Sequence, residues 1–175
     1  MKSVITLQNG KKLNANQFIS YFEKKVFYTI RKYNLLKNEK RRFNFNVQEL
    51  LIKNKIGNTR ISHESLDDIS LQVFEAFMIK GNIKKKIKEL LPIRHKNKQI
   101  IIRPFYFMTK KEIKIYAKLK NIALKKEKRE TVLSLWLNDF EKRHLEVKNA
   151  IVNSILRIEE SSARLRSTNE SCHHH

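Results

Sequence analysis

The stretch QIIIRPFYF (residues 99–107) decides the fold class. Its apolar side chains follow one another without the alternation that marks a strand with one face in water. A short run of this kind is typical of a β-strand that is covered on both faces, as in α/β proteins. A second extended segment is expected at Thr59–Ser62. We therefore predict a small two- or three-stranded parallel sheet near residues 59–62 and 99–107.

Outside this strand, apolar residues recur at the three- to four-residue spacing of amphipathic helices. Thr109 and Glu112 match a capping box, so a helix should begin at residue 110. Gly57-Asn58 would be the C-cap of the second helix, and Asn9-Gly10 a type I′ turn in a hairpin over residues 4–13. The other helices are expected at about 17–36, 45–56, 66–80, 83–91, 128–142 and 146–166.

The core faces of the last helices follow from the same spacing. The first of these two helices should bury Leu135, Trp136 and Phe140. The second should bury an isoleucine-rich stripe made of Val147, Ile151, Ile155 and Ile158. The helix that begins at Leu66 should bury Phe77 in the same way.

The composition indicates a basic, helix-rich protein with a core. There are 38 Lys and Arg against 17 Asp and Glu, a net charge of +21, and only three Gly and two Pro in 175 residues. An excess of this size repels itself unless a polyanion binds to it. Codon bias explains part of the Lys and Asn content, but not the many Arg or the scarcity of acids. We therefore expect contact with nucleic acid, with an anionic membrane surface as the second candidate.

Cysteine usage and hydropathy restrict the class of protein further. The one cysteine is Cys172, so a disulfide framework or a cysteine metal site within the chain is excluded, and no metal or cofactor is expected. No apolar run reaches the ~18–20 residues that span a bilayer, and no signal peptide is recognised at the N-terminus. These observations predict a cytoplasmic protein that is not a membrane protein.

Basic side chains are grouped in short runs at the ends of the expected elements. Such a run is most often a solvated face, but several of them in one small domain favour contact with phosphates. The candidate RNA-binding residues are Lys40, Arg41, Arg42, Lys84, Lys85, Lys86, Lys125, Lys126 and Arg129. Because most Phe residues fit the apolar stripes, we expect contact with the backbone of the RNA rather than base readout.

Three stretches in order resemble the tRNA 2-thiouridine and 2-thiocytidine synthetases, a family of PP-loop ATPases. NGKKLNANQFISYFEKKVFYTIRKYNLL (9–36) resembles the second half of the family's zinc ribbon and its first helix. EKRRFNFNVQELLIKNKIGNTRISHESLDDISLQVF (39–74) is similar to the arginine-containing helix, the short strand and the Leu-Asp-Asp helix start. IIIRPFYFMTKKEIKIYAKLKNI (100–122) resembles the Ile-Arg-Pro-Leu strand and the helix after it; WLNDFEKRHLEVKNAIVNSI (136–155) is a weaker match.

The chain departs from this family at its catalytic machinery. Asn14 and Gln17 stand where the family has zinc-binding cysteines, and amides are poor zinc ligands. The family's glycine-rich phosphate loop falls between Leu36 and Arg41, where nothing similar is found, and Gly occurs only at 10, 57 and 81. The resemblance also implies two catalytic cysteines, and neither is present. Without a thiolate, sulfur transfer has no nucleophile.

The resemblance implies a remnant of a nucleotide site in three residues. Asp67 and Asp68 match the family's paired aspartates, although two acids in the first turn of a helix also simply complement its dipole. Arg103 matches an arginine at the carboxyl edge of the sheet, where α/β proteins bind ligands. A structural ion pair of Arg103 with Asp67 or Asp68 is an equally good expectation.

We therefore predict a mainly helical α/β remnant of a PP-loop (Rossmann-like) ATPase domain with a small parallel sheet. Residues 1–16 would be a remnant of the zinc-ribbon hairpin, 17–166 the truncated domain, and 167–175 a disordered tail or a purification tag. The predicted function is tRNA binding as a non-catalytic component of wobble-uridine 2-thiolation, with a heteromeric partner that carries an intact PP-loop.

Two alternatives stay open at this point. The first is a catalytic thiolation enzyme that a partner chain completes. The second is an unrelated basic helical protein that binds RNA or DNA, which a fold without a sheet at 99–107 would favour.

Overall fold

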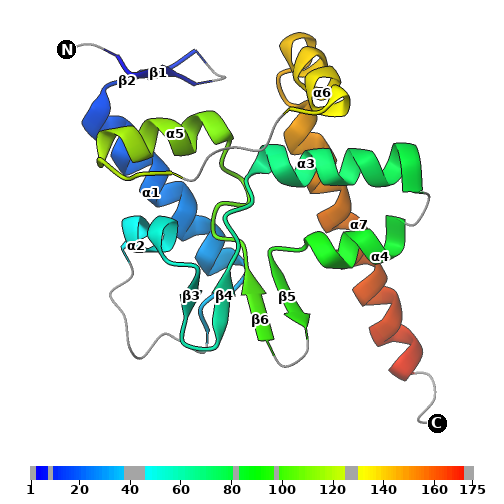
Figure 1. Ribbon diagram of the computed structural model, residues 1–175. Coiled ribbons are helices and arrows are strands. Elements are labelled where there is room, and N and C mark those ends of the chain that lie inside the picture. The colour runs from blue at the N-terminus through cyan, green and yellow to red at the C-terminus, as the bar shows by residue number, and fades with distance from the viewer. Residues whose placement is uncertain are drawn as a thin grey trace.

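The computed structural model describes residues 3–7, 10–37, 46–80, 83–96, 99–124 and 130–171, with only the backbone at 79, 80, 163 and 166–171. The predicted sites Lys40, Arg41, Arg42, Lys125, Lys126 and Arg129 lie outside these residues. The elements in chain order (Figure 1) are β1 (Ile5–Thr6), β2 (Lys12–Leu13), α1 (Ala15–Lys32), α2 (Val47–Ile52), β3 (Lys55–Ile56), β4 (Thr59–Ile61), α3 (Leu66–Glu75), a π-helical segment (Ala76–Lys80), α4 (Ile83–Leu90), β5 (Ile93–Lys96), β6 (Gln99–Ile102), α5 (Lys110–Leu119), α6 (Val132–Arg143) and α7 (Val147–Ser171).

The main sheet has four strands in the order β3-β4-β6-β5. The predicted parallel pairing of 59–62 with 99–107 is confirmed, because β4 runs parallel to β6 with Arg60 opposite Ile101. The sheet is nevertheless mixed, since β3 and β5 add an antiparallel strand at each edge. The α/β class with a small sheet is therefore confirmed, and parallel pairing is limited to the central pair.

The strand predicted over 99–107 is shorter than expected. β6 ends at Ile102, and the chain turns over residues 104–107, where Tyr106 N donates to Arg103 O (3.3 Å). Pro104 cannot continue a ladder because it has no N–H. Phe105 and Tyr106 are fully buried although they lie in this turn. These two residues are apolar because they are buried in the core, and not because they belong to a strand.

The helix predicted over 45–56 is also corrected. α2 ends at Ile52, and β3 pairs with β4 through a two-residue turn at Gly57-Asn58, with Ile56 opposite Thr59. Gly57 has a φ of +53°. A glycine at the first central position is what a type II′ hairpin turn requires. Gly57 therefore turns a hairpin and does not cap a helix.

The N-terminal hairpin is confirmed, with a different turn from the type I′ turn that was predicted. Leu7 N donates to Lys11 O (2.9 Å), so three residues separate the bonded pair, and Gly10 has a φ of +79°. A three-residue loop with its last residue in the left-handed region is the next most common hairpin connection. Asn9 lies outside the described residues.

Asn14 and Gln17, which stand at the family's cysteine positions, form the N-terminal cap of α1. The Asn14 side chain accepts from Gln17 N (3.0 Å), and the Gln17 side chain accepts from Asn14 N (3.1 Å). This reciprocal pair satisfies two of the N–H groups that a helix start leaves without partners. In this chain, both side chains therefore cap the N-terminus of α1.

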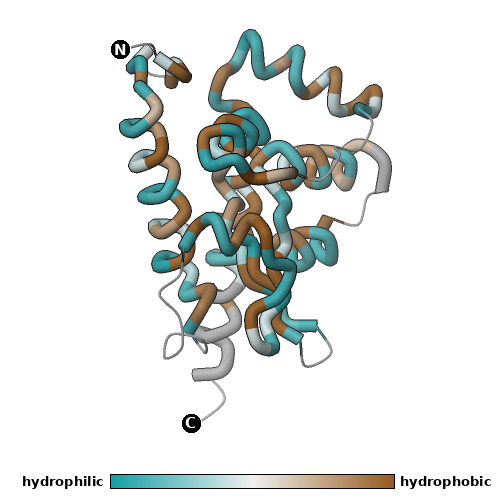
Figure 2. Tube along the Cα trace, turned by 60° about the vertical axis from the view of Figure 1, so that its left-hand side comes forward, coloured by the Kyte–Doolittle hydropathy of each residue, from teal (hydrophilic) through white to brown (hydrophobic). Residues whose placement is uncertain are grey.

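Two hydrophobic clusters hold the elements together. In the first, α1 packs against α5, with the rings of Phe22 and Tyr116 stacked at 4.2 Å, and the cluster also includes buried isoleucines of the sheet. Hydrophobic residues alternate with hydrophilic ones along α1 (Figure 2), as one buried stripe requires. The second cluster joins α3, α4 and α7 through residues such as Ile69, Leu90 and Ile155. Tyr33 packs against both clusters.

The core faces predicted for the last helices are partly wrong. Leu135, Trp136 and Phe140 are exposed, and Leu137 is the buried residue of α6. Phe77 and Ile158 are exposed as well, whereas Ile155 is buried as predicted. α7 runs to Ser171, past the boundary expected at residue 166. Across the described parts of the chain, no helix combines the length and the apolar character that crossing a membrane demands.

Candidate nucleic-acid interface

The register of the main sheet places its basic side chains on one face. Lys55 lies opposite Arg60, Arg60 opposite Ile101, and Ile101 opposite Arg94, so these four residues form one row across the four strands. Residues directly opposite each other in neighbouring strands share a face. Lys96 lies on the same face, because it is two residues beyond Arg94 on the same strand. We call Lys55, Arg60, Arg94, Lys96 and Ile101 the basic sheet face.

The opposite face of the sheet is apolar. Ile56, Ile61 and Ile102 are buried there in the first hydrophobic cluster. The prediction that residues 99–107 are covered on both faces is therefore wrong at Ile101, which is only half-buried. One covered face and one open face are usual where antiparallel strands extend a sheet.

The open face carries a hollow of about 800 Å³. Besides the strands, the segment after β4 and the end of β6 contribute to it. Its lining residues are Asn54, Arg60, Ile61, Ser62, His63, Glu64, Arg94, Lys96, Gln99, Ile101 and Arg103. Four of these are Lys or Arg against one carboxylate, so the hollow has a positive field that attracts anions.

Arg103 differs from the other cations of the hollow because it is buried, with 6% of its side chain exposed. Its Nε donates to Glu64 Oε2 (2.7 Å), Nη1 to Leu91 O (2.6 Å) and Nη2 to Glu89 O (3.0 Å). Glu89 lies in the last turn of α4, where carbonyls lack partners within the helix, and Leu91 directly follows that helix. Arg103 thus ties β6 to the end of α4 and to the segment after β4.

Glu64 is held ionised by its surroundings. Burial alone raises the pKa of this carboxyl, but the Arg103 guanidinium and hydrogen bonds from Gln72 and Ser62 outweigh burial, so that its pKa is lowered. The neighbouring His63 ring bonds to Leu50 O through Nε2 (3.0 Å). The structure thus pairs Arg103 with Glu64, rather than with Asp67 or Asp68.

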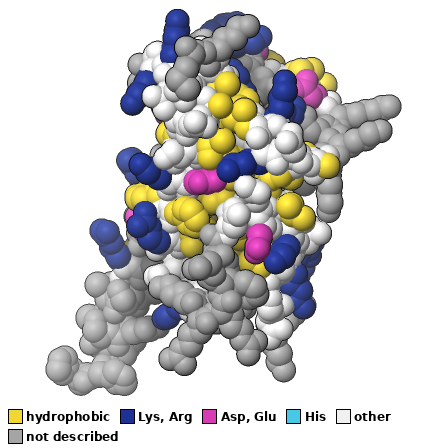
Figure 3. All heavy atoms as spheres, turned by 90° about the vertical axis from the view of Figure 1, so that its left-hand side faces the viewer, with side chains coloured by type: hydrophobic (Ala, Val, Ile, Leu, Met, Phe, Trp, Pro, Cys, Tyr) yellow, Lys and Arg dark blue, Asp and Glu magenta, His cyan; other side chains and the backbone are white. Residues whose placement is uncertain are grey.

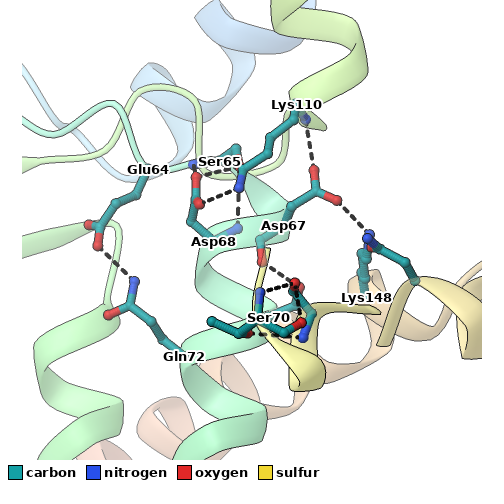
Figure 4. A network of polar contacts seen from close by, with 11 residues as sticks. Glu64, Ser65, Asp67, Asp68, Ser70, Gln72, Lys110 and Lys148 are labelled. Atoms are coloured by element: carbon teal, nitrogen blue, oxygen red, sulfur yellow. Dashed lines mark hydrogen bonds and ion pairs between the residues drawn. The ribbon is translucent and has the colours of Figure 1, made fainter. Parts of the chain in front are cut away.

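Asp67 and Asp68, at the start of α3, make different contacts (Figure 4). Asp68 completes a capping box, since its carboxylate accepts from Ser65 N (3.0 Å), and it also pairs with Lys110 Nζ (2.8 Å). Asp67 accepts from Lys110 N (2.7 Å), the first N–H of α5, and from Lys148 Nζ (2.5 Å). Both carboxylates therefore stabilise helix starts, and the nucleotide-site remnant stays a prediction.

Lys148 is the buried cation of this network, with 3% of its side chain exposed. Its Nζ donates to Asp67, to Asn138 Oδ1 (2.8 Å) and to Glu141 Oε2 (2.7 Å). Burial lowers the pKa of Lys148, but the hydrogen bonds to Asp67 and Glu141 outweigh it and leave the pKa raised. Three acceptors match the three N–H bonds of an ammonium, so Lys148 joins α7 to α3 and α6.

Of the predicted RNA-binding residues, the structure describes Lys84, Lys85 and Lys86 on α4. Lys84 and Lys85 are exposed, and Lys86 lies 3.9 Å from Glu89. They do not line the hollow. Lys55, Arg60 and Arg94 were missed because they are isolated basic residues, and only the strand period brings them together.

Basic side chains are arranged differently on another side of the molecule. On the side that lies to the left in Figure 1, they surround a strip of hydrophobic side chains, with a few acidic groups between them (Figure 3). On that side the basic side chains lie around the edges of the hydrophobic strip, whereas on the main sheet the strand register brings them together on one face. The basic sheet face is therefore our candidate interface.

Comparison with known proteins gives a distant likeness to solved structures. No protein-family model and no curated protein matches the chain. The U34-tRNA thiolase NcsA from Methanococcus maripaludis, solved with its [4Fe-4S] cluster, is similar over 85% of this chain and 45% of its own, with a TM-score of 0.49 and 18% identity. The chain thus spans less than half the length of that thiolase. Among the described residues, no three His, Cys, Asp or Glu side chains form a metal-binding group.

Proposed function

We propose that this chain binds tRNA as a non-catalytic component of wobble-uridine 2-thiolation. The basic sheet face carries the proposal, because it offers a row of cations on a surface that the described residues leave open. The net charge of the chain, +21, is also positive. The order of the sequence motifs supports the link to thiolation. A strand at 99–102 also disfavours the alternative of an unrelated, sheetless helical protein.

Catalysis is assigned to a partner, because this chain holds few of the groups that the reaction needs. Its single cysteine is Cys172, and its three glycines are too far apart to form a phosphate loop. A cradle for pyrophosphate requires clustered backbone N–H groups at a helix start. We therefore propose a heteromeric partner that carries an intact PP-loop and the reactive thiols, with tRNA held in part by this chain.

We expect folded tRNA to bind with a steep salt dependence. If Lys55, Arg60, Arg94 and Lys96 each neutralise one phosphate, the slope of log K against log[salt] is about −3.6. Affinity then falls about 10²-fold between 50 and 200 mM salt. Fluorescence anisotropy with labelled tRNA measures this slope. An affinity that is constant over this range, or no binding at 50 mM, would contradict the proposal.

The isolated chain should not bind ATP. The only glycines are at 10, 57 and 81, so no loop can surround a triphosphate with backbone N–H groups. Calorimetry with ATP and Mg²⁺ should therefore show no micromolar site. One saturable site with a micromolar Kd would instead favour a catalytic role. It would also support the prediction that Asp67, Asp68 and Arg103 belong to a nucleotide site.

A further inference from the structure

We propose that the hollow on the basic sheet face binds unpaired nucleotides of RNA rather than a double helix. This inference rests on the proposed function, and it names the part of the RNA that the site takes. Three features of the hollow carry it: the placement of its cations, the chemistry of its floor and its size.

The cations lie on both sides of a floor. Arg60 on β4 and Arg94 on β5 are separated by β6, so their backbones are about 10 Å apart, twice the spacing of neighbouring strands. Between them lies Ile101, half-buried and apolar. A nucleotide chain that enters the hollow can therefore place phosphates at the sides and a base or ribose over Ile101.

The lining of the hollow also has groups that phosphates do not need. Asn54, Ser62 and Gln99 line the hollow with uncharged hydrogen-bonding side chains. Groups of this kind suit base edges and 2′-hydroxyls, whereas phosphate contacts are dominated by cations. In an A-form helix the bases are stacked inside and the major groove is deep and narrow. A duplex would therefore meet the cations but could not reach the floor.

The size of the hollow agrees with this ligand. Pockets for drug-sized molecules measure about 300–1,000 Å³. The volume of about 800 Å³ accommodates one or two nucleotides. Because the lining includes no Phe, Tyr or Trp, bases would pack on Ile101 and on the guanidinium planes of Arg60 and Arg94. This packing accepts any base, so we expect weak sequence preference.

A comparison of RNA forms tests the inference on the full chain. The probes are a fluorescent 12-nucleotide oligouridine and a 12-base-pair RNA duplex, measured by anisotropy at 100 mM salt. We expect the single strand to bind at least 10-fold more tightly. The double substitution Arg60→Ala/Arg94→Ala should weaken the single strand about 10-fold or more, and the duplex less, because the duplex loses only phosphate contacts. Ile101→Ala, which keeps every charge, should weaken only the single strand.

The matched control is Lys142→Ala/Arg143→Ala, which removes the same charge from exposed positions of α6 outside the hollow. It should weaken both RNAs equally and only slightly. Photocrosslinking of a 4-thiouridine oligonucleotide to wild-type protein should mark the peptide that contains residues 99–103. Equal affinity for the two RNAs, equal losses in the two double variants, or crosslinks only elsewhere would overturn the inference. Salt-dependent tRNA binding would then still support the proposed function, whereas tRNA binding that is constant between 50 and 200 mM salt, or absent at 50 mM, would remove both.

Discussion

Replacement of Arg103 by alanine is expected to lower the free energy of unfolding by about 3–5 kcal/mol, the range measured when one partner of a buried ion pair is removed. The substitution deprives Glu64 of its cation and leaves the carbonyls of Glu89 and Leu91 without the donor that now caps α4. For a domain of this length, the melting temperature should fall by about 10 °C.

Arg94 provides the matched control for Arg103. It is also an arginine at the hollow and also pairs with a glutamate, Glu89 at 3.4 Å, but 25% of its side chain is exposed. Arg94→Ala should cost less than about 1 kcal/mol, as exposed pairs do. Thermal and urea denaturation of both variants gives the comparison. If Arg103→Ala melts within 2 °C of Arg94→Ala, Arg103 is not the structural link described above, and a ligand role for it gains support.

The loss of unfolding free energy caused by Arg103→Ala should also depend on pH. The pKa of Glu64 is lowered in the folded protein, so the stability that its charged form contributes is present above its ordinary value of 4.5 and is lost as the pH falls through the lowered pKa. The difference between wild type and Arg103→Ala should therefore narrow in acid. Urea titrations at pH 7 and pH 3 measure this change, and an undiminished difference at pH 3 would show that Glu64 contributes little.

Lys148→Met is expected to cost about 2–4 kcal/mol, because it leaves Asp67 and Glu141 without the cation between them. Methionine retains an apolar side chain as far as Cε and lacks only the ammonium group, so the loss reflects mainly charge and hydrogen bonds rather than packing. The largest change should occur at α6, which has one buried residue, Leu137, to hold it. Amide hydrogen exchange of Lys148→Met, compared with wild type, should be accelerated more in α6 than in α1.

Lys142→Met is the control for Lys148, since Lys142 pairs with Asp139 on the same helix while 76% of its side chain is exposed. It should leave stability unchanged within error. The pKa of Lys148 is raised in the folded protein, so its contribution is complete at neutral pH and is lost only as the pH rises through that raised value, above the ordinary 10.5. A cost for Lys148→Met that disappears between pH 6 and pH 8 would contradict this network.

The fold was predictable where local patterns carry the signal. The Thr109–Glu112 capping box and the parallel pairing of strands near 59–62 and 99–107 are predicted correctly, although β6 ends at Ile102. β5 was missed because its sequence, Ile-Arg-His-Lys, has too little apolar character. The stripe of Leu135, Trp136 and Phe140 has the helical period, but the period alone does not show whether another element covers it.

The candidate site was harder to predict than the fold. Runs of lysine are visible in a sequence, whereas Arg60 and Arg94 lie 34 residues apart and meet only through the register of three strands. The ion pair expected between Arg103 and Asp67 or Asp68 is wrong, because the partner is Glu64, a close neighbour of both aspartates in sequence. The structure separates them: Glu64 lies before the start of α3, and the two aspartates lie in its first turn.

The parallel pairing of β4 with β6 sets an order of events during synthesis. β4 ends at Ile61, and its partner is complete only at Ile102, about 40 residues later. At about 5–20 residues per second, the ribosome needs roughly 2–8 s to deliver that partner. The β3–β4 hairpin can form at once through its two-residue turn. Until β6 is synthesised, however, the other edge of β4 has no partner strand, and an unpaired edge can pair with another chain. A nascent chain of this protein should therefore be most vulnerable to aggregation between these two points.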